Sequence, residues 1–147
     1  MPEVAVTAAV PGAGPDAVFS TVADFASYAQ HTDAVRQVVV TSVDGGAVES
    51  AWEVNFRNGV LAWTERDVVD PGARRIDFEQ VDGDFVVFTG AWAVEPDGDG
   101  AIVRFSASFD LGMPSLAPMI DPIATRALAE SVQSILAGLL GPGVTFS

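Results

Sequence analysis

Two acidic residues two positions apart, Glu65 and Asp67, are the side chains of this sequence best suited to acid–base chemistry. They lie in an alternating stretch, Trp63-Thr64-Glu65-Arg66-Asp67, that is typical of a β-strand, so both point to the face that carries Trp63. Two carboxylates on one apolar face repel each other, and burial beside indole rings would raise the pKa of at least one toward the range of a general acid or base. The alternative is that both lie at a solvated rim or pair with an arginine such as Arg74.

The neighbouring strands predict which other side chains share the face of Glu65 and Asp67. A four-residue turn from Asp70 to Ala73 would oppose the following pairs across the next hairpin: Asp67 and Ile76, Glu65 and Phe78, Trp63 and Gln80. The predicted interior is therefore lined by aromatic rings, with few polar groups. The candidate substrate-binding residues are Tyr28, Trp63, Phe78, Gln80, Phe88, Trp92, Phe105 and Ile123.

Each of these candidates has a structural alternative. An inward tryptophan such as Trp63 or Trp92 can stack on a planar substrate or simply fill a core. Gln80 could orient a substrate carbonyl or bond a neighbouring carboxylate. Tyr28 and the single histidine, His31, fall in the segment after the first predicted helix, where a lone histidine is more often an exposed loop residue than a catalyst.

The composition argues against several kinds of site. The chain of 147 residues has 20 acidic side chains against seven arginines and no lysine, and its net charge of −13 repels nucleic acid and anionic membrane surfaces. Without cysteine and with one histidine, it has no thiolate nucleophile and no ligand set for zinc or non-haem iron. No serine lies in a nucleophile motif with a histidine partner. A metal site, if present, would have to be all-oxygen, and we expect none.

The expected location follows from the hydropathy of the chain. Its first residues form neither a basic nor a long apolar segment, and no stretch approaches the ~18 uninterrupted apolar residues of a membrane span. We therefore expect a cytoplasmic protein. The sequence leaves open whether it is a monomer or a homodimer.

The hydrophobic pattern predicts one α+β domain over residues 1–147. A strand at 3–10 is followed by a short helix near Pro15 and a second helical turn at 24–30. Six strand-like runs follow at 35–43, 47–57, 60–69, 74–81, 85–95 and 101–110, separated by turn sequences such as Asp44-Gly45-Gly46, Asn58-Gly59 and Asp70-Pro71-Gly72. A helical pattern occupies 115–140, with a kink or a late start after Asp121 because Pro122 lacks an N–H.

These elements predict a sheet wrapped around a helix. A curved antiparallel sheet of about seven strands has one concave apolar face, and only the last helix is long enough to cover it. Small residues at inward positions, Gly90, Ala107 and Ala127, would leave a ligand cavity beneath that helix. Ile123 belongs to one of two apolar stripes along the helix.

Four stretches carry a pattern that extends over nearly the whole chain: Val18-Phe19-Ser20-Thr21-Val22-Ala23-Asp24-Phe25 with Tyr28; Trp63-Thr64-Glu65-Arg66-Asp67; Gln80-Val81-Asp82-Gly83-Asp84-Phe85 with Gly90-Ala91-Trp92; and Phe105-Ser106-Ala107-Ser108-Phe109-Asp110. This pattern resembles the helix-grip superfamily of START-like (SRPBCC) domains, and within it the small polyketide cyclase and aromatase proteins, with coenzyme Q-binding proteins close by. The resemblance implies a deep pocket for a hydrophobic, often polyketide-derived molecule. In the cyclases, that pocket folds the molecule for ring closure by aldol condensation and dehydration.

The chain departs from this family at two places. Several aromatic cyclases have an inward arginine where this chain has Asp67, with Arg66 on the opposite face, and Tyr28-Ala29 replaces an aromatic–proline pair. An arginine-centred mechanism is therefore not expected. We expect a cofactor-free cyclase-type enzyme of secondary-metabolite biosynthesis, such as antibiotic biosynthesis, with acid–base help from Glu65 and Asp67, or with pericyclic closure that needs the pocket alone. The alternative is a non-catalytic carrier for a quinone, a lipid or a pathway intermediate.

Overall fold

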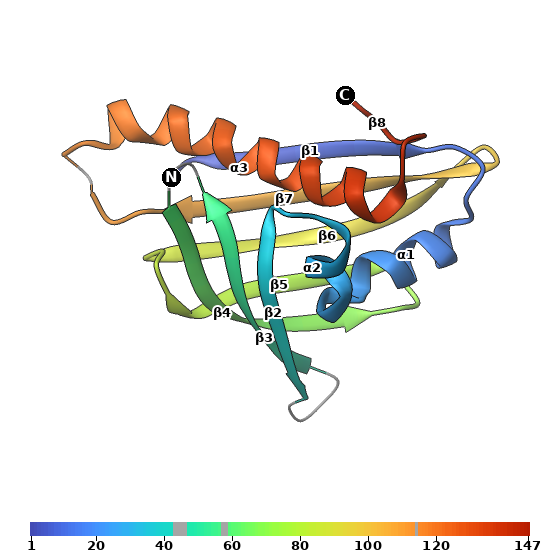
Figure 1. Ribbon diagram of the computed structural model, residues 1–147, viewed down its shortest axis with the longest axis horizontal. Coiled ribbons are helices and arrows are strands. Elements are labelled where there is room, and N and C mark those ends of the chain that lie inside the picture. Colours follow the sequence, from blue (N-terminus) through green and yellow to red (C-terminus); the bar gives the residue numbers. More distant parts are fainter. Residues whose placement is uncertain (43–46, 57–58, 114) are drawn as a thin grey trace.

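The computed structural model describes residues 1–42, 47–56, 59–113 and 115–147 (Figure 1). The elements occur in the order β1 (Glu3–Val10), α1 (Pro15–Ala23), the 3-10 helix η1 (Phe25–Ser27), α2 (Tyr28–His31), β2 (Val35–Ser42), β3 (Ala47–Phe56), β4 (Gly59–Asp70), β5 (Arg75–Gly83), β6 (Val87–Asp97), β7 (Gly100–Asp110), α3 (Ala117–Leu140) and β8 (Thr145–Phe146). The predicted turns at 44–46 and 58–59 lie wholly or partly outside the described residues. Within those residues, no helix combines the length and hydropathy that crossing a membrane requires.

All of these strands belong to one antiparallel sheet with the order β2-β3-β4-β5-β6-β7-β1-β8. The predicted α+β helix-grip fold is confirmed, and the sheet has eight strands where about seven were expected. The additional strand, β8, consists of Thr145 and Phe146, paired with Ala9 and Ala8 of β1. Two residues are too few to show a hydrophobic period, so the sequence gives no sign of this strand.

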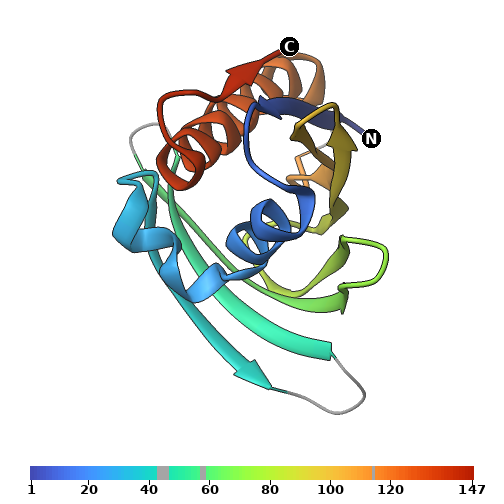
Figure 2. The same cartoon turned by 90° about the vertical axis from the view of Figure 1, so that its right-hand side faces the viewer.

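The sheet is curved, and helices close its concave side (Figure 2). The long helix α3 lies across β1 and reaches β3, whereas α1 packs on β6 and β7, and η1 and α2 pack on β2. Alternation along each strand supplies the buried face; in β1, for example, Val4, Val6, Ala8 and Val10 are buried. The core therefore lies between the concave face of the sheet and α3.

Of the two outcomes predicted around Pro122, a kink or a late start of the last helix, the late start does not occur. The helix begins at Ala117 rather than after Asp121, with Pro118 in its first turn and Pro122 inside it. The missing N–H of Pro122 removes one hydrogen bond, to the carbonyl of Pro118, while two other amides of this first turn bond to the carbonyl of Leu116. The late start is therefore wrong, because losing one bond costs less than unwinding the whole turn, whereas a kink at Pro122 stays a prediction.

One of the two predicted stripes of α3 is buried, and the other is not. The buried residues of the helix are Ala124, Leu128, Val132, Ile135 and Leu136. Ile123, on the other stripe, is 49% exposed. The helix therefore presents the Leu128 stripe to the concave face of the sheet.

The hairpin of β4 and β5 pairs in a different register from the predicted one. The observed opposed pairs are Asp67 with Phe78, Glu65 with Gln80, and Trp63 with Gly83. The loop comprises residues 71–74, one position later than predicted, and Arg74 takes a φ of 52° in it. Moving the loop by one residue moves the pairing by two, so Glu65 and Asp67 keep their predicted face. A further irregularity in the pairing between Thr64 and Glu65 shifts the partner of Trp63 by one more residue, to Gly83.

Gly90 does not open a cavity, contrary to the expectation. A Cβ at this position would lie 2.0 Å from the backbone oxygen of Ser106 and 2.9 Å from the ring of Phe78. Neighbouring atoms therefore already occupy the space that a side chain would take. Ala107 is buried, and Ala127 is only half-buried on α3. The glycine instead allows close approach of β6 and β7 and leaves room for Phe78.

Candidate active site

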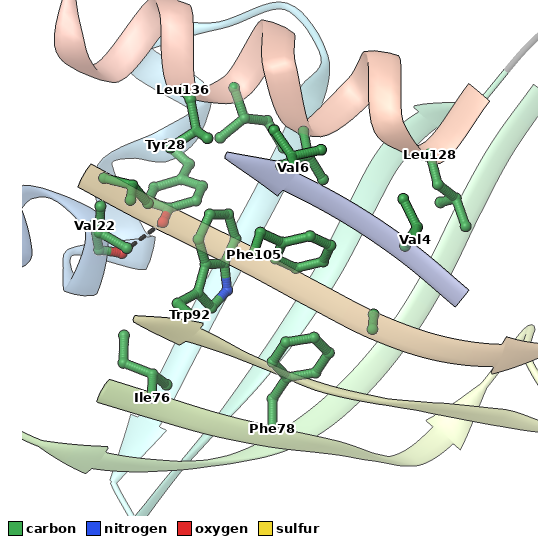
Figure 3. Packing of buried hydrophobic residues seen from close by; sticks show 14 of the residues in the cluster. Val4, Val6, Val22, Tyr28, Ile76, Phe78, Trp92, Phe105, Leu128 and Leu136 are labelled. Atoms are coloured by element: carbon green, nitrogen blue, oxygen red, sulfur yellow. Dashed lines mark hydrogen bonds between the residues drawn. The ribbon is translucent and has the colours of Figure 1, made fainter. Parts of the chain in front are cut away.

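A cavity lies between the concave face of the sheet and α3. Its wall includes all three tryptophans of the chain, Trp52, Trp63 and Trp92. The other lining side chains are Val4, Val54, Phe78, Phe88, Phe105, Leu128, Val132, Ile135, and two polar residues, Glu65 and Ser131. Figure 3 shows part of this wall, where the rings of Phe78, Trp92 and Phe105 lie in the space between the sheet and α3.

The cavity is much smaller than the sequence and the family resemblance predict. Its volume is ≈ 50 Å³, which holds only about three to five water molecules, whereas ligand pockets usually measure ~300 Å³ or more. Ring stacking accounts for the difference: Trp52 lies parallel to Trp63 with centroids 5.8 Å apart, and Phe78 is stacked on Phe105 at 5.8 Å. A polyketide-sized molecule therefore fits only if these rings or α3 move.

Glu65 and Asp67 are both in the interior. Their exposed fractions are 3% and 0%, so the alternative of a solvated rim is wrong. Arg74 does not pair with them either, since its guanidinium lies 3.1 Å from Asp16. None of the ion pairs found among the described residues includes Glu65 or Asp67.

Two donors bond the carboxyl groups, and a third donor bonds one of these two. Trp63 Nε1 donates to Glu65 Oε1 at 2.8 Å, and Ser50 Oγ donates to Asp67 Oδ2 at 2.5 Å. Trp52 Nε1 donates to Ser50 Oγ at 2.8 Å. Asp67 Oδ1 receives no hydrogen bond from any N–H or hydroxyl of the described residues. Both tryptophans of the stack therefore support the acid pair, one directly and one through a serine.

Burial and proximity keep protons on this pair. Burial, followed by the hydrogen bond and negative charge of Asp67, raises the pKa of Glu65 well above its usual range, and the Trp63 hydrogen bond opposes this only in part. Burial also raises the pKa of Asp67, against the hydrogen bonds from Glu65 and Ser50. A proton thus remains available at a higher pH than an exposed carboxyl allows, and Glu65 presents its carboxyl to the cavity.

Five of the predicted substrate-binding residues line the cavity: Trp63, Phe78, Phe88, Trp92 and Phe105. Gln80 does not, because both ends of its amide are engaged by the backbone of Phe85, at 2.7 Å and 3.2 Å. These two hydrogen bonds hold the turn after β5. Among the described residues, Gln80 therefore neither bonds a carboxylate nor lines the cavity, the two roles considered for it.

Tyr28 and Ile123 also lie outside the cavity wall. Tyr28 is fully buried, and its hydroxyl donates to the carbonyl of Val22 at 2.5 Å (Figure 3). Val22 belongs to the last turn of α1, where carbonyls lack helical partners, so Tyr28 caps that helix. Ile123 lies on the outer side of α3, in a shallow apolar depression with Phe56 and Leu111. His31 ends α2 and is exposed.

Among the polar and aromatic residues of the site, three were not sequence candidates: Ser50, Trp52 and Ser131. Strand alternation places Ser50 and Trp52 on the inward face of β3, and Ser50 pairs directly with Glu65. The signal that could have identified Ser50 was therefore a small polar residue at an inward strand position. Ser131 follows Leu128 by three residues and belongs to the same face of α3, a spacing that helical periodicity could have identified.

No metal site is apparent in the described part of the chain, where no three His, Cys, Asp or Glu side chains converge. The acid pair alone has two carboxyl groups and an apolar surrounding. The arrangement can therefore donate and accept protons, and it can hold a flat apolar molecule against its rings.

A sequence model of the family described as "Polyketide cyclase / dehydrase and lipid transport" matches residues 11–136. The chain belongs to this family. The matched range contains Glu65, Asp67 and nearly all of the residues that line the cavity. No curated protein gives a significant sequence match.

Solved structures show the same fold. The Thermus thermophilus protein TTHA0849 has a TM-score of 0.86 and 25% identity, with 94% of each chain covered. The Zhui aromatase/cyclase of a Streptomyces species has a TM-score of 0.81 and 19% identity, with 94% of this chain and 90% of that chain covered. A START superfamily protein from Mycobacterium smegmatis has a TM-score of 0.79 and 20% identity, with 95% and 97% covered.

Proposed function

We propose that this family member is a cyclase-type enzyme that binds a hydrophobic, polyketide-like substrate beneath α3 and promotes its ring closure without a cofactor. The observation that carries this proposal is a buried carboxyl with a raised pKa, Glu65, in an otherwise aromatic and aliphatic cavity wall. Asp67 lies beside it as its proton partner. A role in secondary metabolism, such as antibiotic biosynthesis in the cytoplasm, belongs to the same proposal.

A protonated Glu65 suits both steps of an aldol cyclisation. As the enol carbon of a poly-β-ketone bonds to a carbonyl carbon, the carbonyl oxygen gains a proton from Glu65 and the enol hydroxyl returns one. In the dehydration, Glu65 protonates the departing hydroxyl, and its carboxylate takes the proton of the neighbouring carbon as water leaves. Glu65 ends each step as it began.

The cavity wall supplies the other part of catalysis. A flexible chain must bring its reacting carbons together, and a pocket that holds it folded can lower the barrier by several kcal/mol. The stacked and tilted rings offer flat apolar faces for such a chain. If the closure is pericyclic, this folding would suffice without acid–base help.

A substrate of this kind requires the cavity to open. The volume of ≈ 50 Å³ is far below that of a polyketide chain. The wall on the side of α3 consists of Leu128, Ser131, Val132 and Ile135, and it is formed by one helix rather than by a continuous sheet. Movement of α3 away from the sheet is therefore the simplest way to admit the substrate.

The test is to fill the cavity and measure ring closure. A linear poly-β-keto thioester serves as the probe, and the appearance of aromatic absorbance serves as the signal. Ser131→Leu places a larger apolar side chain into the cavity and should abolish closure, whereas Ser134→Leu, on the exposed side of the same helix, should leave it unchanged. Equal rates for the two variants would reject the cavity as the reaction site.

A non-catalytic carrier of a quinone, a lipid or a pathway intermediate is the second candidate. The observation that favours it is the small number of polar groups in the cavity wall, namely Glu65 and Ser131. A carrier would bind the thioester probe in a manner sensitive to Ser131→Leu and release it unchanged. Ring closure by the wild-type protein above the rate in buffer would exclude this candidate.

A further inference from the structure

Ser50 connects the stacked tryptophans to the acid pair. It is fully buried on β3, directly opposite Glu65 in the register of β3 and β4. Its oxygen accepts the N–H of Trp52 at 2.8 Å, and its hydroxyl donates to Asp67 Oδ2 at 2.5 Å. Because an indole N–H can only donate, the single proton of the serine hydroxyl is left to point at Asp67.

This arrangement distinguishes the two carboxyl groups. Asp67 Oδ2 accepts the Ser50 hydroxyl, so the remaining oxygen, Oδ1, is the atom left for Glu65 to approach. A hydroxyl that donates to a carboxyl oxygen favours the ionised form of that carboxyl, and the Trp52 N–H polarises the Ser50 hydroxyl further. With Asp67 ionised and Glu65 protonated, the Glu65 hydroxyl can donate to Asp67 Oδ1, the oxygen that accepts neither an N–H nor the Ser50 hydroxyl.

We propose that Ser50 is a positioning residue that keeps Asp67 ionised and leaves the shared proton on Glu65, the carboxyl that faces the cavity. Its importance for catalysis rests on the proposed function, but the location of the proton does not. Ser50 itself touches neither the cavity nor a substrate in it. It acts through Asp67, which accepts a hydrogen bond from protonated Glu65.

The other groups around the pair leave this assignment intact. Tyr28 faces both carboxyls from α2, but its hydroxyl is engaged by Val22, and burial, followed by the neighbouring acidic groups, raises its pKa well above that of a free tyrosine. On β5, Gln80 lies opposite Glu65 with its amide engaged by the backbone of Phe85. From α3, the polar group that reaches the cavity is Ser131, which carries no charge.

The test is to follow the two side-chain carboxyl carbons by NMR as pH changes, without substrate. In the wild-type protein, Asp67 should ionise at a lower pH than Glu65. Ser50→Ala should raise the midpoint pH of Asp67 ionisation by about one unit, because a hydrogen bond to the carboxylate is lost. The same variant should lower the midpoint pH of Glu65 ionisation. Ser50→Thr, which keeps a hydroxyl, should restore the wild-type order, and Ser106→Ala on the exposed face should change neither midpoint.

Two further variants test the hydrogen bonds of the two tryptophans. Trp63→Phe removes the donor of Glu65 and should raise the Glu65 midpoint, the opposite of the Ser50→Ala effect. If Ser50→Ala does not fold, Trp52→Phe leaves the hydroxyl but removes its N–H donor, and a smaller rise at Asp67 is expected. Glu65 ionising first, or unchanged midpoints in the variants, would overturn the assignment. Because this readout needs no turnover, a catalytically inactive protein would count against the proposed function alone.

Discussion

The indole rings of Trp52 and Trp63 are parallel, with their centroids 5.8 Å apart and an angle of 2° between their planes. The N–H of each ring takes part in the hydrogen bonds that hold the acid pair, Glu65 and Asp67. Trp63 donates directly to Glu65, and Trp52 donates to the serine that bonds Asp67. The two rings face each other because Trp52 and Trp63 are paired residues of β3 and β4. The same stack therefore narrows the cavity and holds its acids.

The position of all three tryptophans predicts a direct binding signal. Since every indole of the chain lines the cavity, a molecule that enters it must contact most of the intrinsic fluorophores. A neutral naphthoquinone should quench most of the tryptophan fluorescence in a saturable manner. Ser131→Leu should prevent this quenching, and Ser134→Leu should not. Weak, non-saturable quenching that is equal in both variants would contradict entry into the cavity.

The raised pKa of Glu65 predicts how stability depends on pH. The folded protein keeps a proton on Glu65 that the unfolded chain releases near the usual pKa of 4.5, so the stability contribution of this group is lost as pH rises above that value. Glu65→Gln mimics the protonated acid and removes this loss. As pH rises, the free energy of unfolding of the variant should therefore increase relative to that of the wild type by about 1.4 kcal/mol per pH unit. The increase should stop at the pH where Glu65 of the folded wild type also ionises.

Urea denaturation of both proteins from pH 4 to 8 measures this difference. Glu79→Gln is the matched control, since Glu79 is exposed on β5 and pairs in register with Arg66 on the outer face. A constant difference between Glu65→Gln and the wild type at every pH would contradict the raised pKa.

Tyr28 is predicted to be a structural residue. Tyr28→Phe keeps the ring, which packs edge-on against Phe25, Trp52 and Trp92, but leaves the carbonyl of Val22 without its donor. The variant should lose about 1 to 3 kcal/mol of unfolding free energy. Its affinity for naphthoquinone should match that of the wild type. Unchanged stability with weaker binding would assign the hydroxyl to the ligand instead.

Gly90 is predicted to be required for close packing of the sheet. Gly90→Ala places a Cβ 2.0 Å from the Ser106 oxygen and 2.8 Å from Ala107 Cα, both backbone atoms of β7. The strands must separate, and a loss of about 1 to 3 kcal/mol or more is expected. Gly59→Ala is the control, because its nearest neighbour is 3.9 Å away. Thermal denaturation compares them, and equal midpoints would contradict the packing argument.

The sequence was sufficient to place Glu65 and Asp67 on the inward face, even though the predicted hairpin register was wrong. Side chains alternate with a period of two, so a register error of two residues leaves their faces unchanged. The turn geometry that caused the error depends on the left-handed conformation of Arg74, which a non-glycine residue adopts rarely and which no pattern reveals.

The interior of the site could not be predicted in the same way. The cavity volume depends on how the rings of Trp52, Trp63, Phe78 and Phe105 pack against one another, and residue types alone do not determine those angles. Alternation could have identified Ser50 as inward, but its link between Trp52 and Asp67 is a side-chain geometry that only the structure provides.

The most direct test of the account is the rate of ring closure by Glu65→Gln. On the poly-β-keto thioester, this variant should close the ring about a hundredfold more slowly than the wild type or worse, with unfolding free energy at pH 7 no lower than that of the wild type. Glu79→Gln should retain the wild-type rate. A folded Glu65→Gln protein with wild-type turnover would contradict the assignment of Glu65 as the catalytic acid.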